Sequence, residues 1–233
     1  MKIIGLICCR AGSKGIKNKN IKNFAGKPII NWIYEEIKKA KIFDEIYLST
    51  DSRKLFKIGK KIGFISDLRP KYLATSTADV FDTHKYIFEK FKIHDKTHIV
   101  CCINNNPFIK KNHFVDTFKL FKKSGFKKTV MLAKKIDKEN IFFRQSQKKK
   151  NTLYPIFRKN LINSQINRQS HSESYVNIGD LRWAKITTLS KYKNFNIEIC
   201  KNGFSFLEVK NSEYLDLNTY KDWKLALNNF KKI

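Results

Sequence analysis

Short apolar runs alternate with amphipathic segments over the first 135 residues of the 233-residue chain, and this alternation restricts the fold more than any other feature. Each run has the length of a strand, and its continuous apolar character is typical of a strand covered on both faces. The segments between the runs carry apolar residues at helical spacing. We therefore predict an α/β fold in which a mostly parallel sheet lies between helices on both faces, as a three-layer sandwich.

The predicted strands of this region lie at 2–9, 45–50, 97–103 and 127–133, with a short one starting at 64–65, and the predicted helices lie at 28–41, 52–62, 79–91 and 110–123. Gly63 is expected to end the second helix, because glycine readily adopts the left-handed conformation that is common there. The third helix is expected to bury one face, formed by Val80, Thr83, Ile87 and Phe91.

After residue 135 the alternation lapses. The sequence there predicts a hairpin with strands at 140–146 and 152–157 around a turn at 148–151, extended chain at 175–186, strands at 198–200 and 206–209, and a helix at 219–230. No internal repeat or low-complexity linker separates these segments. We therefore expect a single domain over 1–233, with 140–175 as an arm or insertion that would suit exchange between two subunits.

The chain is strongly basic, with 48 Lys and Arg against 20 Asp and Glu and a formal net charge of +28. Only 7 of these cations are Arg, the residue that usually makes bidentate contacts to bases and phosphates, and the lysines are scattered. We therefore expect no nucleic-acid partner but a favourable field for a small polyanionic substrate. A basic nucleic-acid binder is kept as an alternative, which salt-sensitive binding without sequence preference would support.

The sequence also limits the location of the chain. No stretch approaches 18 uncharged apolar residues, and the apolar opening at 3–9 is followed by Arg10 and Lys14 rather than by a small-residue cleavage site, so neither a membrane span nor a secretory signal is expected. The five cysteines have no zinc-ligand spacing, and their adjacent pairs end strand-like runs. We interpret them as reduced thiols of a cytoplasmic protein.

The loop that follows the first predicted strand, at 10–20, has the composition of a phosphate site. In parallel sheets ligands bind beyond the carboxyl ends of strands, where this loop, Asp51, the segment 104–107 and the turn near Lys134 are expected. The loop matches neither a Walker A motif nor Gly-x-Gly-x-x-Gly. It nevertheless offers glycines that let backbone N–H groups turn inward, one hydroxyl and three cations, namely Gly12, Gly15, Ser13, Arg10, Lys14 and Lys19. The alternative is an ordinary basic surface loop.

The order of these residues resembles the amino-terminal signature of the acylneuraminate cytidylyltransferases. The matching stretches are Arg-Ala-Gly-Ser-Lys-Gly at 10–15, Lys-Asn-Ile at 19–21 and Gly-Lys-Pro at 26–28, followed by shorter matches at 43–46, 49–51, 69–70, 73–74, 77–78 and Asp82, then near 105–107, at 168–169, around Gly179 and at 216–223. The resemblance implies an α/β sandwich of nucleotidyltransferase type (Rossmann-like, as in nucleotide-diphospho-sugar transferases) and a homodimer.

The resemblance also implies a reaction. The anomeric hydroxyl of a nine-carbon 2-keto sugar acid (a nonulosonic acid of sialic, pseudaminic or legionaminic type) attacks the α-phosphorus of CTP, pyrophosphate leaves, and Mg²⁺ assists. Such chemistry needs positioning and charge neutralisation more than a covalent nucleophile. Two alternatives stay open: a transferase of the same fold that uses a 3-deoxy-octulosonic acid, and a non-catalytic nucleotide-binding relative.

By resemblance, the nucleotide site takes residues from the first half of the chain. The triphosphate would be held by Arg10, Ser13, Lys14 and Lys19, of which Arg10 and Lys19 are the catalytic candidates, and Asn20 would contact the nucleoside. The cytosine pocket would be lined by backbone near Cys9, Arg69 and Ala78. From the residues alone, Arg69 has the alternative of a surface ion pair, and Asp51 that of a helix N-cap.

The acceptor and metal sites take residues from the second half. Arg168, which precedes an aromatic residue and a glycine (Tyr175 and Gly179), would bind the sugar carboxylate, with Asn105 and Tyr175 beside the sugar. The segment 179–183, Gly-Asp-Leu-Arg-Trp, resembles the Gly-x-x-x-Trp of pseudaminic-acid members.

Two departures from the family pattern concern the same sites. Ile-Asn-Asn-Asn-Pro at 103–107 replaces the usual Gln-Pro-Thr-Ser-Pro, so the sugar-contacting Gln is missing and asparagines would substitute. Asp216-Leu217-Asn218 replaces the Asp-Ile-Asp whose carboxylates hold Mg²⁺. An amide is a weaker ligand than a carboxylate for this cation, so we expect Mg²⁺ dependence with weakened metal affinity.

Overall fold

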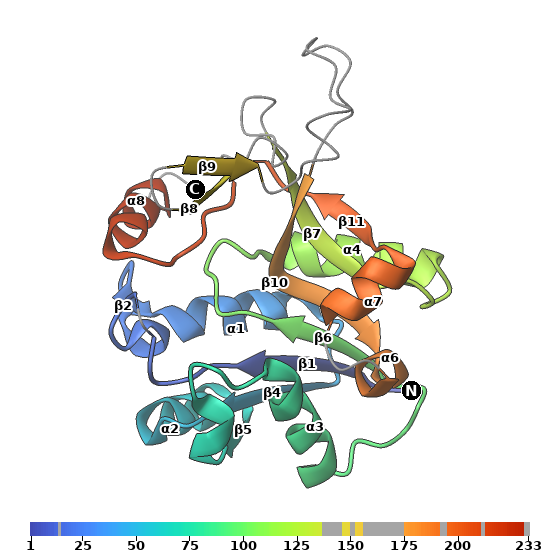
Figure 1. Cartoon of the computed structure of the whole chain (residues 1–233). Helices are drawn as coiled ribbons and strands as arrows, with labels where there is room; N and C mark the ends of the chain where they lie inside the picture. Colours follow the sequence, from blue (N-terminus) through green and yellow to red (C-terminus); the bar gives the residue numbers. More distant parts are fainter. Residues whose placement is uncertain are drawn as a thin grey trace.

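The computed structural model describes residues 1–13, 15–136, 146–149, 152–155, 175–191, 195–210 and 213–230 (Figure 1). Within these residues a seven-stranded sheet has the order β11-β7-β10-β6-β1-β4-β5. Its strands are β1 (Ile3–Cys8), β4 (Glu45–Thr50), β5 (Ile65–Leu68), β6 (Ile99–Ile103), β7 (Val130–Lys135), β10 (Tyr175–Lys185) and β11 (Ser205–Glu208). All pairings are parallel except those of β10, which runs antiparallel to both β6 and β7.

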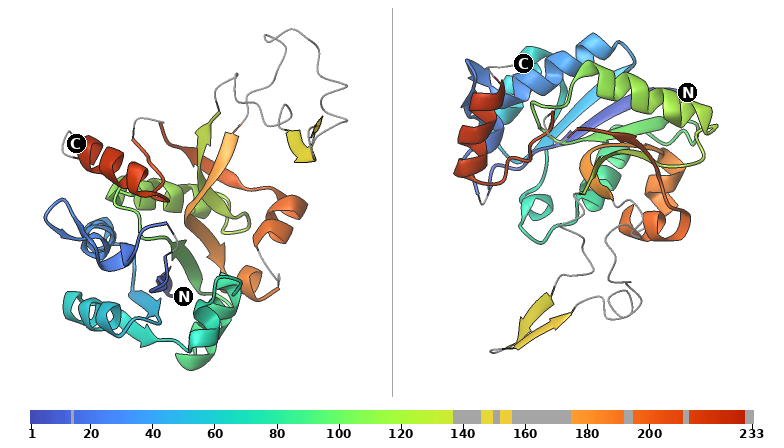
Figure 2. Two further views of the ribbon diagram at one scale, coloured as in Figure 1. Left: turned by 60° about the vertical axis from the view of Figure 1, so that its left-hand side comes forward. Right: turned by 90° about the horizontal axis from the view of Figure 1, so that it is seen from above.

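Helices cover both faces of this sheet, as predicted (Figures 1 and 2). The helices are α1 (Ile29–Ala40), α2 (Arg53–Ile62), α3 (Val80–Lys90), α4 (Lys111–Lys123), α6 (Ile186–Lys191), α7 (Phe195–Asn202) and α8 (Tyr220–Phe230), with 3₁₀ turns η1 (Lys19–Ile21) and η2 (Lys71–Ala74). Side chains of α1, α2, α4 and α8 pack into one hydrophobic cluster, and those of α3, α6 and α7 pack into the other. The described residues therefore form the expected three-layer α/β sandwich.

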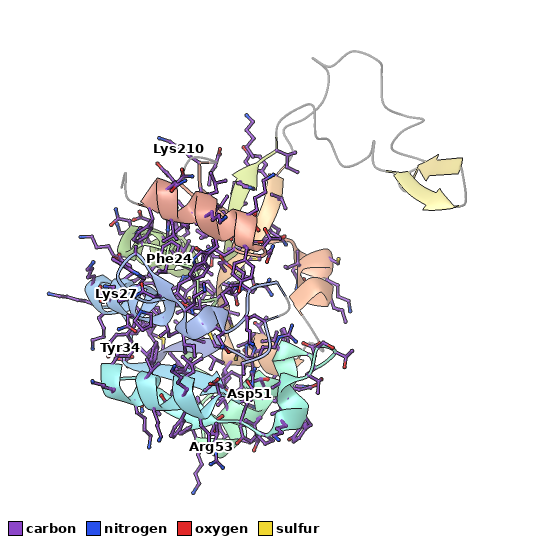
Figure 3. All side chains as sticks on the ribbon, turned by 90° about the vertical axis from the view of Figure 1, so that its left-hand side faces the viewer. Phe24, Lys27, Tyr34, Asp51, Arg53 and Lys210 are labelled. Carbon is purple, nitrogen blue, oxygen red and sulfur yellow. The ribbon has the colours of Figure 1, made fainter. Side chains whose placement is uncertain are left out.

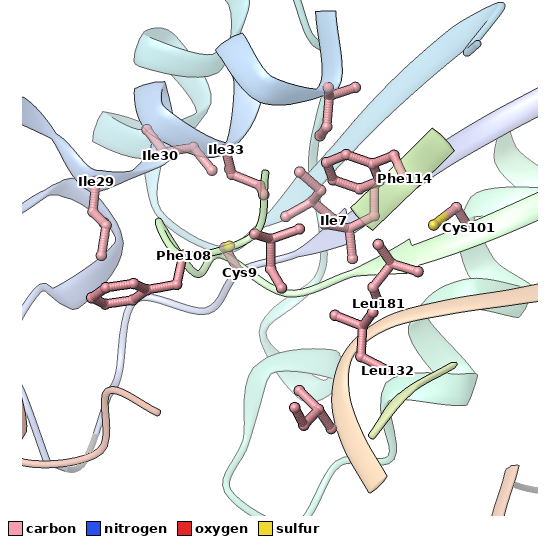
Figure 4. Packing of buried hydrophobic residues seen from close by; sticks show 14 of the residues in the cluster. Ile7, Cys9, Ile29, Ile30, Ile33, Cys101, Phe108, Phe114, Leu132 and Leu181 are labelled. Atoms are coloured by element: carbon pink, nitrogen blue, oxygen red, sulfur yellow. The ribbon is translucent and has the colours of Figure 1, made fainter. Parts of the chain in front are cut away.

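The central strand β1 illustrates why the apolar runs are continuous. Ile4 and Leu6 belong to the cluster beside α3, whereas Ile7 belongs to the cluster beside α1 (Figure 4). Because successive side chains of a strand point to opposite faces, both sets must be apolar when both faces are covered. No helix of the described residues is long and apolar enough to cross a membrane.

The carboxyl-terminal helix α8 closes one end of the sheet beside a small hairpin, β2 (Asn23–Phe24) and β3 (Lys27–Pro28), which the sequence did not predict. The Phe24 ring lies between α1 and α8 (Figure 3) and makes edge-on contacts with Trp223 at 5.2 Å and Phe230 at 5.1 Å between ring centroids. This packing holds α8 against the hairpin that follows the loop after β1.

Several sequence-based expectations were wrong in detail. Residues 198–200, Glu-Ile-Cys, lie in α7 rather than in a strand, because so short a segment fits either element and Gly203, with φ of 63°, ends a helix there. Val80 is 46% exposed at the start of α3, where Phe81 and His84 are buried instead. The extended segment stops at Lys185, and Ile186 begins α6, which the sequence did not predict.

The predicted hairpin is present over 146–155, whereas residues 140–145 of its predicted first strand lie outside the described residues. Strands β8 (Ser146–Lys149) and β9 (Thr152–Pro155) pair antiparallel, and Lys149 pairs with Thr152. Lys148 and Lys149 therefore belong to a strand and not to the turn. The rest of the arm predicted at 140–175 lies outside the described residues, apart from Tyr175.

Candidate active site

A cavity of about 640 Å³ opens at the carboxyl ends of β1 and β6, at the edge of the sheet where ligands were expected. The start of the antiparallel strand β10 reaches the same edge. The cavity is lined by Cys8, Cys9, Arg10, Ser13, Gly15, Ile16, Lys19 and Asn20 from β1 and its loop, Asn104–Asn106 after β6, Lys134 of β7, Val176–Asp180 of β10, and Tyr214, Asp216, Leu217 and Asn218 before α8.

Backbone hydrogen bonds fix the path of the loop after β1. The Cys9 N–H donates to the Ser49 carbonyl at 2.9 Å, and the Ala11 N–H donates to Asp51 Oδ1 at 2.7 Å. Asp51 therefore holds this loop, and the N-cap of α2 is Ser52, whose Oγ accepts from the Leu55 N–H at 3.2 Å. The suggestion that Asp51 caps the helix was wrong. Figure 3 places Asp51 near the start of α2.

Two predicted phosphate ligands, Arg10 and Lys19, lie in the cavity wall with one contact each to a distant backbone carbonyl. Arg10 Nη1 donates to the Thr75 carbonyl at 3.0 Å, and Lys19 Nζ donates to the Leu217 carbonyl at 3.0 Å. Each side chain keeps further donors for an anion. Ser13 also lines the cavity, whereas Lys14 lies outside the described residues.

Gly15 brings this loop into close contact with the segment before α8. A Cβ atom placed on Gly15 would lie 1.8 Å from the Asn218 carbonyl oxygen, far inside van der Waals contact. Glycine is therefore required here for a close approach between the loop and residue 218. Gly12, in contrast, has nothing within 4 Å of its Cβ position.

Asn20 and Asn105 join the loop after β1 to the loop after β6. Asn105 Nδ2 donates to Asn20 Oδ1 at 3.1 Å, and Asn20 Nδ2 donates to the Arg10 carbonyl at 3.0 Å. Both amides are buried, and Asn105 Oδ1 has no hydrogen-bond partner among the described residues. A buried acceptor of this kind is costly unless a ligand or water satisfies it, so the Asn105 oxygen is available to a ligand donor.

Arg69 is buried, 6% exposed, beneath the loop after β1. Its Nη1 donates to Thr83 Oγ1 at 3.3 Å, and its Nε has no partner in the described part of the chain. The alternative of a surface ion pair was therefore wrong. Arg69 lies close enough to Cys8 and Cys9 to oppose the effect of burial, which raises the pKa of each thiol to about 12.

Neither Arg69 nor Ala78 is among the residues that line the cavity. The Ala78 N–H donates to Thr75 Oγ1 at 3.0 Å, in the turn whose carbonyl accepts from Arg10. Both residues thus lie beside the cavity rather than in its wall.

On the acceptor side the structure separates the predicted residues. Asn105 lines the cavity, but Tyr175 does not: its ring packs against Phe206 with centroids 4.9 Å apart. Arg168 lies outside the described residues. Trp183 is fully buried in the core, where its Nε1 donates to Thr117 Oγ1 at 2.8 Å, so this residue of the Gly-x-x-x-Trp segment contacts no ligand in the cavity.

Asn106 and Lys134 line the cavity from two segments that the sequence placed at this edge, 104–107 and the turn near Lys134, whereas the sequence assigned no role to Asp180 or Tyr214. Asp180 accepts from the side chains of Asn104, Asn106 and Tyr214 at 2.6–3.0 Å. Burial, with the nearby Asp180 carboxylate, raises the pKa of Tyr214 well above its usual range. Asp180 is the one acid of β10, but Asn177, Arg182 and Lys185 lie in the same strand, so no local pattern singles it out.

The candidate metal ligands, Asp216 and Asn218, lie side by side in the cavity wall. Asn218 Nδ2 donates to Asp216 Oδ2 at 2.8 Å, which leaves the other carboxylate oxygen open. Among the described residues no group of three or more His, Cys, Asp or Glu side chains could hold a metal. One carboxylate with an amide oxygen fits Mg²⁺ when phosphate oxygens supply further ligands, as this cation often binds through one or two carboxylates and substrate phosphates.

Several solved structures share this fold. Among solved structures, a CMP:2-keto-3-deoxy-manno-octonic acid synthetase complexed with CTP superposes with a TM-score of 0.75 at 13% identity, over 100% of this chain and 99% of that one. A 4-diphosphocytidyl-2C-methyl-D-erythritol synthase from Anaerococcus prevotii has a TM-score of 0.58 at 15% identity, over 99% of each chain. These likenesses establish the fold.

A family model described as cytidylyltransferase matches residues 4–201, and the chain belongs to this family. A pseudaminic acid cytidylyltransferase of Campylobacter jejuni (serotype O:23/36) is 35% identical over 127 residues, which are 52% of this chain and 53% of the relative. An N-acylneuraminate cytidylyltransferase of Oncorhynchus mykiss is 31% identical over 125 residues, 53% of this chain and 28% of the relative. The matches thus span about half or less of these relatives' lengths.

Proposed function

We propose that the chain transfers CMP from CTP to the anomeric hydroxyl of a nine-carbon 2-keto sugar acid. The observation that carries the proposal is the cavity of this cytidylyltransferase. Arg10 and Lys19 line it from the loop after β1, and Asp216 lines it from the segment before α8. Cationic side chains can bind the negatively charged triphosphate, and an open carboxylate oxygen can bind the Mg²⁺ ion that accompanies it.

In the proposed reaction, the sugar oxygen forms a bond to the α-phosphorus while the bond from that phosphorus to the bridging oxygen of pyrophosphate breaks. The hydroxyl proton leaves to solvent. Negative charge grows on the departing pyrophosphate, and we propose that Arg10, Lys19 and Ser13, which line the cavity, donate hydrogen bonds to its oxygens. Lys14, next in the same loop, is proposed as a further phosphate ligand.

Mg²⁺ is proposed to be held by Asp216 and Asn218 together with the triphosphate, where it would neutralise phosphate charge. We further propose that buried Arg69, with Ala78 and the backbone near Cys9, lies at the cytosine end of the site. The Arg69 Nε has no partner among the described residues, which gives that proposal a physical basis. A buried donor without an acceptor favours a ligand that supplies the acceptor.

The acceptor is proposed to be a nonulosonic acid of pseudaminic or sialic type, which is what the names of the matching relatives state for those proteins. Arg168 and Asn105 are proposed to bind it. A cytoplasmic homodimer is proposed as the working form, and light scattering on the purified chain tests its oligomeric state.

The experiment measures pyrophosphate release with CTP and Mg²⁺ across sialic, pseudaminic, legionaminic and octulosonic acids, with UTP and ATP as nucleotide controls. We expect release with CTP and one nine-carbon acid. Lys19→Met should lower the rate about a hundredfold, the scale of losing one preorganised donor. The matched variant Lys119→Met removes a 71% exposed lysine side chain of α4 and should leave the rate unchanged. Release with octulosonic acid alone, or none from folded protein, would contradict the proposal.

A further inference from the structure

Asp180 is a buried acid in the wall of the active-site cavity, 9% exposed, and the ion pairs of the described residues do not include it. Three neutral donors surround its carboxylate instead. Asn104 Nδ2 donates to Oδ1 at 3.0 Å, and both Asn106 Nδ2 and the Tyr214 hydroxyl donate to Oδ2 at 2.6 Å. Hydrogen bonds to an ionised acceptor are short and strong, so this carboxylate holds its three neighbours tightly.

The orientation of the Asn106 amide is fixed by its other contacts. Its Oδ1 accepts from the Phe108 N–H at 3.0 Å, and its Nδ2 also donates to the Leu215 carbonyl at 3.1 Å. If the amide were flipped, its NH₂ group would face the Phe108 N–H, and its oxygen would face two acceptors, Asp180 Oδ2 and the Leu215 carbonyl. Residue 180 must therefore present an acceptor to Asn106.

This network ends on the chain segment 214–218, which contains neither helix nor strand. Tyr214 is held through its hydroxyl, and the backbone carbonyls of Leu215 and Leu217 are held by Asn106 and by Lys19. Asp216 lies between these held residues, and its exposed side chain lines the cavity.

We infer that Asp180 is a positioning residue: through Tyr214 and Asn106 it holds the segment 214–218 so that the Asp216 carboxylate faces the triphosphate and its cation. The inference rests on the proposed function for the role of Asp216. Both Asp180 oxygens already accept from protein side chains, so we assign it a positioning role and not a catalytic one.

The test uses the full chain and CTP binding by calorimetry, with and without Mg²⁺ and without acceptor. The measured quantity is the factor by which Mg²⁺ tightens CTP binding. Asp180→Ala should reduce this factor about tenfold, the lower end of the effect of losing a residue that orients a metal ligand. Tyr214→Phe, which removes a single hydroxyl, should reduce it in the same direction by less. Binding of CTP without Mg²⁺ should be unchanged in both.

Asp216→Ala should reduce the factor by which Mg²⁺ tightens CTP binding by the same amount. The double variant that combines Asp180→Ala and Asp216→Ala should reduce it no further than Asp216→Ala alone, because both changes act through one carboxylate. A second readout needs no nucleotide: hydrogen exchange of a peptide covering 213–218 should accelerate in Asp180→Ala and Tyr214→Phe, while a peptide covering β4 stays protected. Asp116→Asn, an exposed acid of α4, is the matched control and should change neither readout.

Additive losses in the double variant, or unchanged exchange at 213–218, would overturn the inference. Equal loss of CTP binding with and without Mg²⁺ would also overturn it, since that result marks general damage to the cavity. Failure of the proposed function looks different: the wild-type chain would then release no pyrophosphate with any acceptor, while the exchange experiment still decides whether Asp180 holds the segment.

Discussion

Replacing Gly15 by alanine should separate the two halves of the active-site cavity. The added Cβ would lie 1.8 Å from the Asn218 carbonyl oxygen, whereas carbon and oxygen atoms in contact are about 3.3 Å apart. The loop after β1 and the segment before α8 must therefore move apart by about 1.5 Å. These two segments carry Lys19 and Asp216, which are proposed to act on the same triphosphate.

A displacement of about 1 Å at a reacting centre can cost about a hundredfold in rate, so we expect kcat/KM for pyrophosphate release to fall by about two orders of magnitude. The loss of stability should be modest, about 1–3 kcal/mol, as for other overpacked sites. Steady-state pyrophosphate release and urea unfolding measure the two effects on the same samples.

Gly12→Ala is the matched control, because a Cβ at Gly12 meets nothing within 4 Å. It lies in the same loop and makes the same chemical change. If Gly15→Ala were as active as Gly12→Ala, the close approach between residues 15 and 218 would have no role in catalysis, and the reasoning would be wrong.

Three further predictions concern the metal site, the buried histidine and the thiols. Asn218→Asp should lower the Mg²⁺ concentration for half-maximal rate, because it adds a carboxylate beside Asp216; an unchanged Mg²⁺ titration would show that residue 218 is not at the metal. Burial lowers the pKa of His84 to about 3, so the unfolded chain takes up this proton near pH 6.5 and the folded chain does not. Its contribution to the free energy of unfolding should therefore fall by about 1.4 kcal/mol per pH unit between about pH 6 and pH 3, and His84→Gln should remove that part of the slope in urea titrations at several pH values. Cys200 is exposed, whereas burial raises the pKa of Cys8, Cys9 and Cys102 to about 12 and that of Cys101 well above its usual range. A single fast thiol should therefore react with an alkylating reagent near pH 8, and Cys200→Ser should abolish this reaction.

The layers of the fold could be predicted from sequence because each buried strand has a local signature. The run at 45–50 appears in the structure as β4, and the helix ended by Gly63 appears as α2. The continuous burial of β4 and the glycine cap of α2 each depend on only a few neighbouring residues. The order of the strands could not be predicted in this way. Strand β10 lies between β6 and β7 and runs against both, an arrangement that depends on how the chain returns after the arm and on no local pattern.

The candidate site divides in the same manner. The loop at 10–20 is compact in sequence, and its glycines and cations indicate a phosphate site directly. The Asp180 network joins residues from β10, the loop after β6 and the segment before α8. Asn106 lies 74 positions from Asp180 in the sequence, and Tyr214 lies 34 positions from it. Such contacts arise only when the sheet forms, and because β10 also contains Asn177, Arg182 and Lys185, its single acid does not mark them in the sequence.

The product that forms from CTP tests the proposed function most directly. The chain should be incubated with CTP, Mg²⁺ and the panel of sugar acids, and the mixture analysed by mass spectrometry together with released pyrophosphate. We predict a CMP-linked nine-carbon sugar acid and one pyrophosphate for each molecule of it, with Lys19→Met strongly impaired and Lys119→Met unaffected. Release of pyrophosphate without a CMP-linked product, or equal turnover of UTP and CTP, would contradict the account.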